Sequence, residues 1–171
     1  MEDRKPKPFS RRDLLFGFMD RIRGREPGEE KATGISAPSA KADGLFCEGK
    51  WAEALDAYRE VLGCEAGDVE ARVRVGICLY RLGKHTQAVA ELGAALRKKE
   101  HSLAFLYLGL CHARRGEPDK MTEAWKKYFE PSRVNLQREV NLQVACMEAG
   151  HETDSGQAAD AVEKALAMEQ G

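Results

Sequence analysis

The sequence predicts an all-α protein built as a stack of antiparallel helix pairs. The first observation behind this fold class is a recurring turn signal: Gly49, Gly83, Gly116 and Gly150 stand at spacings of 34, 33 and 34 residues. Self-similarity at such a period is typical of helical repeat arrays. The second observation is composition, since alanine-, leucine- and glutamate-rich segments alternate with short turns and only six prolines occur. Residues 69–100 show the pattern best and serve as the reference pair.

Length and composition limit the function classes. The 171 residues, of which 43% are hydrophobic, are enough for one domain with a core and a tail. A net charge of -1 argues against a general nucleic-acid binder, which needs a basic face to neutralise phosphates. The five cysteines are scattered without metal-ligand spacing, and no apolar run reaches the ~18 residues that span a bilayer. We therefore expect a cytoplasmic protein without nucleic acid, cofactor or metal.

Residues 1–26 differ from the rest of the chain in charge, with eight basic and five acidic residues. Ser10 stands three positions before Asp13, which resembles a capping box and predicts a helix over residues 11–23. Its apolar residues share one face, and a helix of ~13 residues is marginal alone in water, so this face is expected to dock. The predicted partner-docking residues are Arg11, Arg12, Leu14, Leu15, Phe18, Met19 and Ile22.

The same segment resembles a twin-arginine export motif over residues 10–15. An export signal needs an uninterrupted apolar stretch after the arginines, whereas Asp20, Arg21 and Arg23 interrupt it here. A non-exported motif of this kind is similar to the N-termini of some bacterial accessory proteins of respiratory and redox enzymes. This six-residue resemblance motivates a narrow hypothesis, in which the partner is a subunit of a bacterial redox enzyme.

A linker with two prolines and two glycines, residues 27–38, leads into a repeat domain over residues 39–171. Four helix pairs are expected there. Pro118 suits the first turn of a helix, and Pro131 closes the third pair. The fourth pair is looser, with about three extra residues after its turn glycine. The predicted helices are 39–48 and 51–62, 69–82 and 85–98, 102–115 and 118–129, and 132–149 and 155–169.

Equivalent positions in successive pairs carry residues of matched size. Small residues at one site of the first helices let the two helices of a pair approach closely; they are Ala42, Gly76 and Gly109. Bulky residues fill the facing site of the second helices, namely Tyr58, Leu92 and Trp125. A further site, expected to close each turn, holds Leu62, Leu96 and Phe129.

This pattern resembles the tetratricopeptide repeat (TPR), with three good repeats and one degenerate repeat over residues 35–169. Pro38, His112 and the insertion in the fourth repeat depart from it. The resemblance implies a right-handed superhelical solenoid, a concave groove lined by the first helices, and a role as a protein-binding scaffold or adaptor. A known variant clamps a peptide's C-terminal carboxylate with lysine, asparagine and arginine. The matching positions lack that set; they are Ser39, Asp43, Val73, Ile77, Leu106 and Leu110.

The first helices carry more apolar surface than the formation of a pair requires. In the second pair, one stripe through Val75 and Leu79 faces the paired helix, and another runs through Val73, Ile77 and Tyr80. Either this second stripe packs against neighbouring repeats, or it forms the floor of a peptide-binding groove with charged rims. The predicted groove residues are Glu70, Val73, Arg74, Ile77, Tyr80, Arg81, Leu106, Leu110, Arg114, Val140, Val144 and Met147.

The predicted N-terminal helix has several candidate docking sites. It could fill the groove in cis, dock on another copy of the chain, or bind a partner protein. A basic amphipathic helix can also lie on a membrane, but Asp13, Asp20 and a local charge of only +3 disfavour this role.

The sequence shows no catalytic constellation. Cys78 and Cys111 occupy the same site in successive repeats, where a small apolar side chain is wanted, so buried structural thiols are expected. Phosphate-binding, metalloprotease and nucleophile-elbow motifs are all missing from the sequence. The sequence therefore predicts a non-enzymatic protein–protein interaction module. The alternative is a self-assembling scaffold in which the N-terminal helix fills a groove in cis or in a neighbour.

Overall fold

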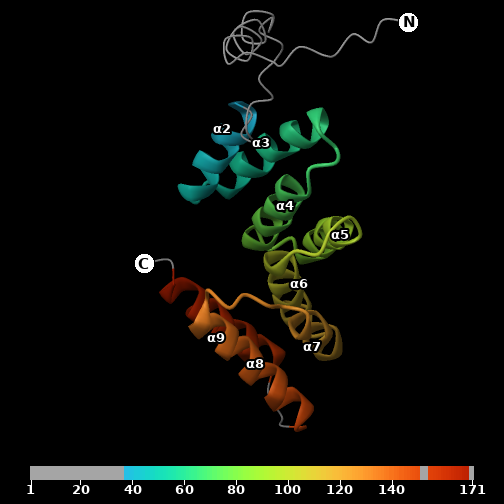
Figure 1. Ribbon diagram of the computed structural model, residues 1–171, viewed down its shortest axis with the longest axis vertical. Helices are drawn as coiled ribbons and strands as arrows, with labels where there is room; N and C mark the ends of the chain where they lie inside the picture. The colour runs from blue at the N-terminus through green and yellow to red at the C-terminus, as the bar shows by residue number, and fades with distance from the viewer. Residues whose placement is uncertain (1–36, 151–153, 170–171) are drawn as a thin grey trace, which may run out of the picture. The chain divides into compact units, whose positions relative to one another are not determined.

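The computed structural model describes residues 37–150 and 154–169, and in these ranges every regular element is an α-helix (Figure 1). The N-terminal segment 1–26 and most of the linker lie outside the described residues. The helices form four successive pairs, which confirms the predicted all-α repeat stack. They are α2 (Ala37–Cys47) and α3 (Trp51–Cys64), α4 (Val69–Arg81) and α5 (His85–Leu96), α6 (Ser102–Arg114) and α7 (Pro118–Lys126), and α8 (Val134–Glu148) and α9 (Ser155–Met168).

The four turn glycines end the first helix of each pair. Gly49, Gly83, Gly116 and Gly150 have φ between 68° and 73°, a left-handed conformation that costs other residues a Cβ clash. At the second pair, Gly83 N–H donates to the carbonyl of Tyr80 at 2.9 Å. The next N–H, from Lys84, donates to a carbonyl one residue further back at 2.8 Å, which completes a Schellman motif. The period seen in the sequence is therefore a period of helix ends.

Helix starts follow from capping chemistry where the sequence supplies it. The side chain of Asp68 accepts a hydrogen bond from the backbone N–H of Ala71 at 3.0 Å, at the start of α4. Asp154 caps α9 in the same way through Gly156, at 3.1 Å. Pro118 lies in the first turn of α7, as predicted, where a missing N–H breaks no intrahelical hydrogen bond.

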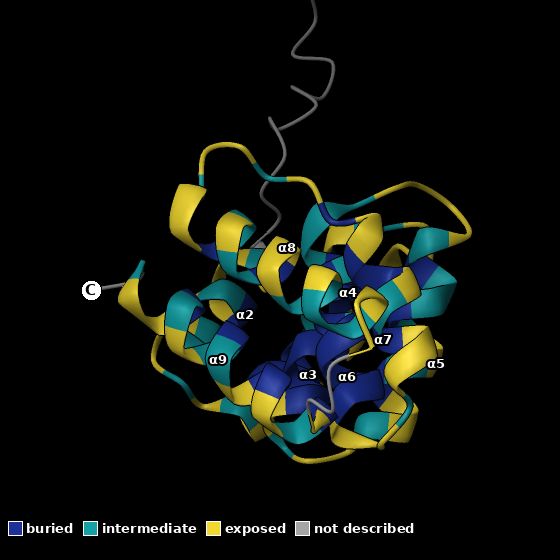
Figure 2. Cartoon of the chain, turned by 90° about the horizontal axis from the view of Figure 1, so that it is seen from below, coloured by how far each residue is buried: buried dark blue, intermediate teal, exposed yellow. Residues whose placement is uncertain are grey.

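The core lies between the paired helices, where the small and bulky sites meet. A Cβ added to Gly76 would stand 2.6 Å from the Leu92 side chain, and one added to Gly109 would overlap the indole of Trp125. The indole N–H donates to the carbonyl of Leu106 at 3.1 Å, so the ring is held in place. Figure 2 shows the buried residues along the inward helix faces. The predicted matching of small and bulky residues therefore describes how the paired helices pack in the core.

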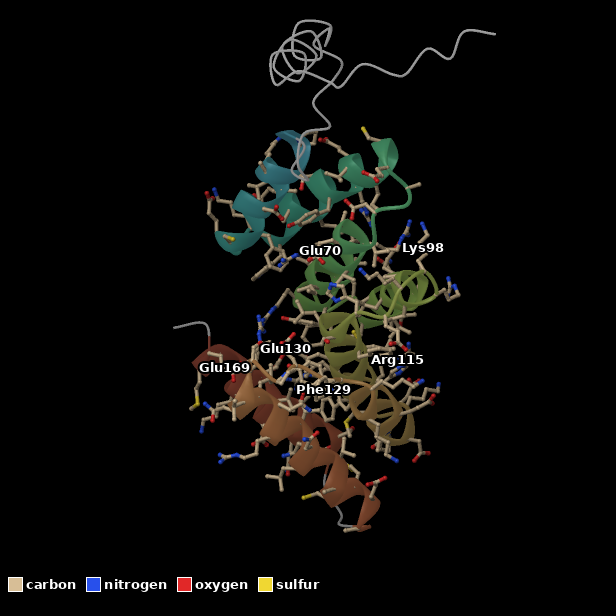
Figure 3. The ribbon with its side chains drawn as sticks, in the orientation of Figure 1. Glu70, Lys98, Arg115, Phe129, Glu130 and Glu169 are labelled. Atoms are coloured by element: carbon tan, nitrogen blue, oxygen red, sulfur yellow. The ribbon has the colours of Figure 1, made fainter. Side chains whose placement is uncertain are left out.

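The third pair departs from the prediction at its end. Helix α7 stops at Lys126, three residues before the predicted end at Phe129. Phe129 is 69% exposed (labelled in Figure 3), whereas the neighbouring Tyr128 is buried. The prediction that Phe129 closes the turn was wrong, because the chain leaves the helix early and turns the next aromatic residue inward.

The last pair packs differently from the others. Helix α4 packs against α6, so first helices are neighbours in the second and third pairs. In the fourth pair, α8 packs against α7, and α9, rather than α8, packs along α6. The looser fourth repeat expected from the sequence therefore changes which helix lies beside α6.

Candidate functional site

The apolar stripe predicted as a groove floor is covered by the domain itself. Six of its members are at most 5% exposed, namely Val73, Ile77, Tyr80, Leu106, Leu110 and Val140. Val144 and Met147 are partly buried against the same core. The open floor expected from the sequence is therefore wrong for these residues, and the alternative of packing within the repeat stack describes them. The stripe needs no external partner to be covered.

Helix α9 covers one end of this stripe through polar contacts as well as packing. The hydroxyl of Tyr80 donates to Glu163 at 2.6 Å. Arg114 donates to Glu163 at 2.5 Å and to Asp160 at 2.7 Å. Ser155 donates to the carbonyl of Ala113 at 3.0 Å. A helix more than forty residues away in the sequence thus closes the ends of α4 and α6.

The sequence of α9 explains why it fits there. One face of α9 is buried, and its apolar residues follow one another at spacings of one, three and four. They are Ala158, Ala159, Val162 and Leu166. Small residues at the first two positions allow a close approach to α6. The carboxylates beside this face are those that reach Arg114, so α9 is an amphipathic helix with acidic flanks.

The charged rim predicted for the groove is present but is paired internally. Glu70 lies on α4 (labelled in Figure 3) and binds Arg74 at 3.1 Å and His101 at 2.8 Å. The hydrogen bond from His101 lowers the pKa of the Glu70 carboxyl. The Arg74 guanidinium also stands 4.8 Å from the Phe46 ring centroid. These side chains link the first three pairs.

The remaining predicted rim residue, Arg81, has aromatic partners. Its guanidinium donates to the Tyr107 hydroxyl at 3.4 Å and lies 5.6 Å from the ring centroid of Trp51. Arg81 itself stays exposed at the end of α4. The predicted rim is therefore a network of contacts between helices, and peptide binding by these residues stays a prediction.

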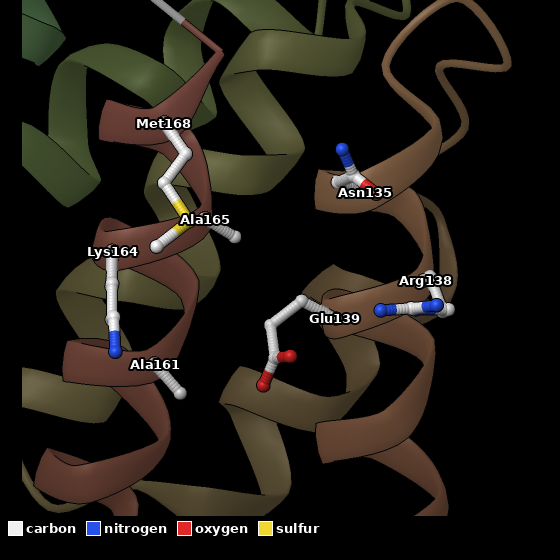
Figure 4. A pocket seen from close by; sticks show the side chains of 7 residues that line it. All are labelled: Asn135, Arg138, Glu139, Ala161, Lys164, Ala165 and Met168. Carbon is white, nitrogen blue, oxygen red and sulfur yellow. The ribbon is translucent and has the colours of Figure 1, made fainter.

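An open groove lies instead between α8 and α9. In this part of the chain, the sequence analysis predicted only the stripe residues Val140, Val144 and Met147 as a site. Its cavity measures about 460 Å³. Figure 4 shows residues of the two helices facing one another across it. The lining residues are Asn135, Arg138 and Glu139 from α8, and Ala161, Lys164, Ala165 and Met168 from α9.

Large apolar side chains are exposed around this groove. Met168 is 69% exposed and lies in its wall, and Leu142, one turn beyond Arg138 on α8, is 52% exposed. Val134, at the start of α8, is also exposed. The sequence did carry a signal for Leu142, since it lies outside the stripe predicted for this helix and seven residues after Asn135. Exposed apolar residues that gather around a concave surface are typical of interaction sites.

A smaller cavity of about 240 Å³ lies between α6 and α7. Phe105, Leu108 and Ala124 supply its apolar lining, and His112 also lines it. The His112 ring nitrogen is 2.6 Å from Glu117, and this hydrogen bond lowers the pKa of the Glu117 carboxyl. The histidine that departs from the repeat pattern is therefore a buried, hydrogen-bonded residue.

The buried cysteines are poorly suited to nucleophilic or redox chemistry. Burial raises the pKa of the Cys78 thiol to about 11 and that of Cys111 to about 12, so both stay protonated near neutral pH. In the described ranges, no cluster of three histidine, cysteine or acidic side chains could hold a metal ion. The helices of these ranges are also too short or too polar to cross a membrane.

These features define an all-α protein built of stacked antiparallel helix pairs. Residues 45–108, from the end of α2 into α6, match the family described as tetratricopeptide repeat. The match includes two of the turn glycines, Gly49 and Gly83, and the small and bulky sites of the second pair, Gly76 and Leu92.

Two curated relatives are similar to the chain over part of its length. The BBSome complex member BBS4 of Mus musculus is 32% identical over 96 residues, which cover 56% of this chain and 18% of that protein. The protein of the same name from Bos taurus is 29% identical over 109 residues, which cover 64% of this chain and 21% of that protein. The alignments thus span about a fifth of the length of these relatives.

Proposed function

We propose that this protein is a non-enzymatic protein–protein interaction module whose binding surface is the last helix pair. The observation that carries the proposal is the contrast between two apolar surfaces. The predicted groove on α4 and α6 is buried within the domain, with α9 over one end, whereas the groove between α8 and α9 is open. Exposed Met168 lines the open groove, and exposed Leu142 lies on the same face of α8 as its lining residues. A polypeptide that covers these side chains removes apolar surface from water.

Two further observations support this function. Residues 45–108 match the tetratricopeptide repeat, a family of interaction scaffolds, and this match supports the proposal. Both relatives are members of a protein complex, the BBSome. We extend to this chain only the general property of binding another protein. The narrower hypothesis of a bacterial redox enzyme as partner gains no support from these relatives.

The experiment is affinity capture from the native cells, with chemical cross-linking to locate the contact. The full-length protein is compared with the double variant Leu142→Asp/Met168→Asp. We expect the variant to lose the captured protein while its circular dichroism and melting temperature stay unchanged, because both side chains are exposed. The control variant, Ala52→Asp/Ala90→Asp, adds the same charges at exposed positions on α3 and α5. Equal capture by all three proteins contradicts the proposed surface.

The self-assembling scaffold remains the competing function, because a second copy could also cover these apolar residues. Sedimentation velocity on the full chain, with and without residues 1–26, separates the two. A monomer over a wide concentration range supports the interaction module. Oligomers that dissociate when residues 1–26 are removed support the scaffold in which that segment docks on a neighbour.

A further inference from the structure

The groove between α8 and α9 also indicates the chemistry of its partner. We propose that it binds an amphipathic helix whose apolar stripe is flanked by carboxylates. This inference rests on the proposed function and specifies the partner of the same surface. Three features support this partner: the helical spacing of the groove walls, the charges of the groove, and the contacts by which the domain already holds α9.

The two walls of the groove are regular helix faces. On α8, Asn135, Arg138 and Glu139 continue to Leu142, and on α9 the wall runs from Ala161 to Met168. Both walls follow the spacing of three, four and seven residues that places side chains on one face. Each wall is about 10 Å long, or two helical turns. Side chains at this spacing on both walls can interdigitate with those on one face of a bound helix.

The apolar part of the groove has a small floor and large ends. Ala161 and Ala165 line it from α9 and are only partly exposed, so a bound backbone can approach closely there. Because α8 and α9 run in opposite directions, Met168 lies near the Asn135 end, as Figure 4 shows. Leu142 then lies toward the other end. An incoming helix is expected to place apolar residues against both ends and small ones between them.

The last pair differs from the others at the close-approach site of its first helix, where α8 lacks a small residue. The position that corresponds to Gly76 and Gly109 in α8 is Gln143, one period of 34 residues after Gly109. Its side chain donates to Glu139 at 2.7 Å. With a long side chain where close helix approach needs glycine, α8 and α9 pack less closely than the preceding pairs.

The charges of the groove favour an acidic partner. Arg138 projects from one wall and Lys164 from the other, and both are exposed. Within the part of the chain that the structure describes, neither forms an ion pair, whereas the one acidic lining residue, Glu139, accepts a hydrogen bond from Gln143. Carboxylates on a bound helix would pair with both cations at the edge of an apolar contact.

The domain already recognises such a helix within its own chain. Helix α9 presents a buried apolar face with Asp160 and Glu163 beside it, and Arg114 of α6 binds both carboxylates. The α8–α9 groove offers the same combination of an apolar surface and a cation from a neighbouring wall. The predicted N-terminal helix of this chain is a poorer occupant, because Arg12 and Arg21 flank its apolar face.

The test uses two designed helical peptides of about 18 residues, long enough to form a helix on binding. Both carry the same leucine and alanine stripe, flanked by glutamates in one and by lysines in the other. Binding to the full-length protein is measured by fluorescence anisotropy. We expect the glutamate peptide to bind at least about tenfold more tightly than the lysine peptide, with the difference falling at high salt.

A charge-swap variant locates the contact. In Arg138→Glu/Lys164→Glu the preference is expected to reverse, so that the lysine peptide binds more tightly. The matched control Lys41→Glu/Lys99→Glu makes the same change in net charge at exposed positions on α2 and before α6, and should keep the wild-type preference. A preference that persists in the charge-swap variant, or wild-type protein that favours the lysine peptide or binds neither, overturns the proposal.

Two further outcomes separate this inference from the proposed function. If neither peptide binds but Leu142→Asp/Met168→Asp still abolishes capture of the native partner, the surface is correct and the acidic helix is wrong. If removal of residues 1–26 strengthens peptide binding by about tenfold or more, the chain's own segment competes for the groove, and the assignment to a separate partner is overturned.

Discussion

The second and third helix pairs differ from the last pair in how closely their helices approach. In the regular pairs, Gly76 and Gly109 sit directly against Leu92 and Trp125, and the site has no room for a Cβ. In the last pair, Gln143 takes the equivalent position, the helices separate and a cavity of about 460 Å³ remains. The closely packed pairs and the pair with the open groove thus differ in residue size at one repeated position.

The same comparison explains why α9 is free to pack elsewhere. In a regular pair, the second helix is held by the bulky residue that rests on the glycine of the first. Without that contact, α9 buries its apolar face against α6 and bonds to Tyr80 and Arg114. Helix α9 therefore takes part in two surfaces. On one side it covers an end of the predicted groove, and on the other side it forms a wall of the open groove with α8.

The largest expected effect comes from adding a methyl group to a regular pair. Gly109→Ala should lower the free energy of unfolding by about 3 kcal/mol, because its Cβ overlaps an indole fixed by a hydrogen bond. Gln143→Ala, at the equivalent place in the last pair, should change it by less than about 1 kcal/mol. Urea denaturation measures both. Similar losses from the two substitutions would refute the distinction between closed and open pairs.

The next effect concerns the attachment of α9 to α6. Arg114→Ala should lower the free energy of unfolding by about 1 kcal/mol, a modest value because the arginine and both carboxylates are partly exposed to solvent. Hydrogen exchange should speed up in α9 and remain unchanged in α5. A double-mutant cycle with Glu163→Gln should give a coupling energy of the same sign. Additive effects would mean that packing alone holds α9.

The turn glycines test whether the last pair is irregular throughout or only in its interior. Gly83→Ala and Gly150→Ala should each lower the free energy of unfolding by about 1 kcal/mol, since φ is 72° and 71° at these positions. Gly44→Ala is the control, because it lies inside a helix with open space around it and should be neutral or stabilising. A neutral Gly150→Ala would show that the last turn is not held in its left-handed conformation.

The smallest expected effect is a loss of folding stability at low pH, which comes from two carboxyls in the regular pairs. Hydrogen bonds from His101 and His112 lower the pKa values of the Glu70 and Glu117 carboxyls below their ordinary value of 4.5. The unfolded chain therefore binds more protons in this range, and stability is lost as the pH falls from about 4.5 through the folded-state pKa values. Thermal melts between pH 6 and 3 should show a shallower pH dependence for Glu70→Gln than for the wild type. An unchanged pH dependence would mean that the Glu70 carboxyl does not contribute to the loss of stability in acid.

Much of the fold could be predicted because its signals are local. A left-handed glycine and an N-terminal proline each act within one helical turn, and Gly83 and Pro118 behave as their residue types require. The end of α7 was missed because Tyr128 and Phe129 are adjacent aromatic residues. Which of them turns inward depends on where the helix stops, and no capping residue marks that point.

The candidate site was harder to predict, because an apolar stripe shows that a helix face is buried but not which element covers that face. The stripe through Val73, Ile77 and Tyr80 showed correctly that a second face of α4 must be covered. It could not show whether a neighbouring helix or a foreign peptide covers it, since both bury the same side chains in the same pattern. The hydrogen bond from Tyr80 to Glu163 joins residues 83 positions apart, a separation that no periodicity connects.

The sequence alone determined the number of helix pairs, their turns and the size rule of their interiors, because these depend on single residues and their immediate neighbours. Only the tertiary structure decided that α9 closes the predicted groove and that α8 and α9 leave another one open. That outcome depends on the competition of distant apolar faces for the same neighbours. We attribute the wider spacing of α8 and α9 to Gln143, which stands where the second and third pairs carry glycine.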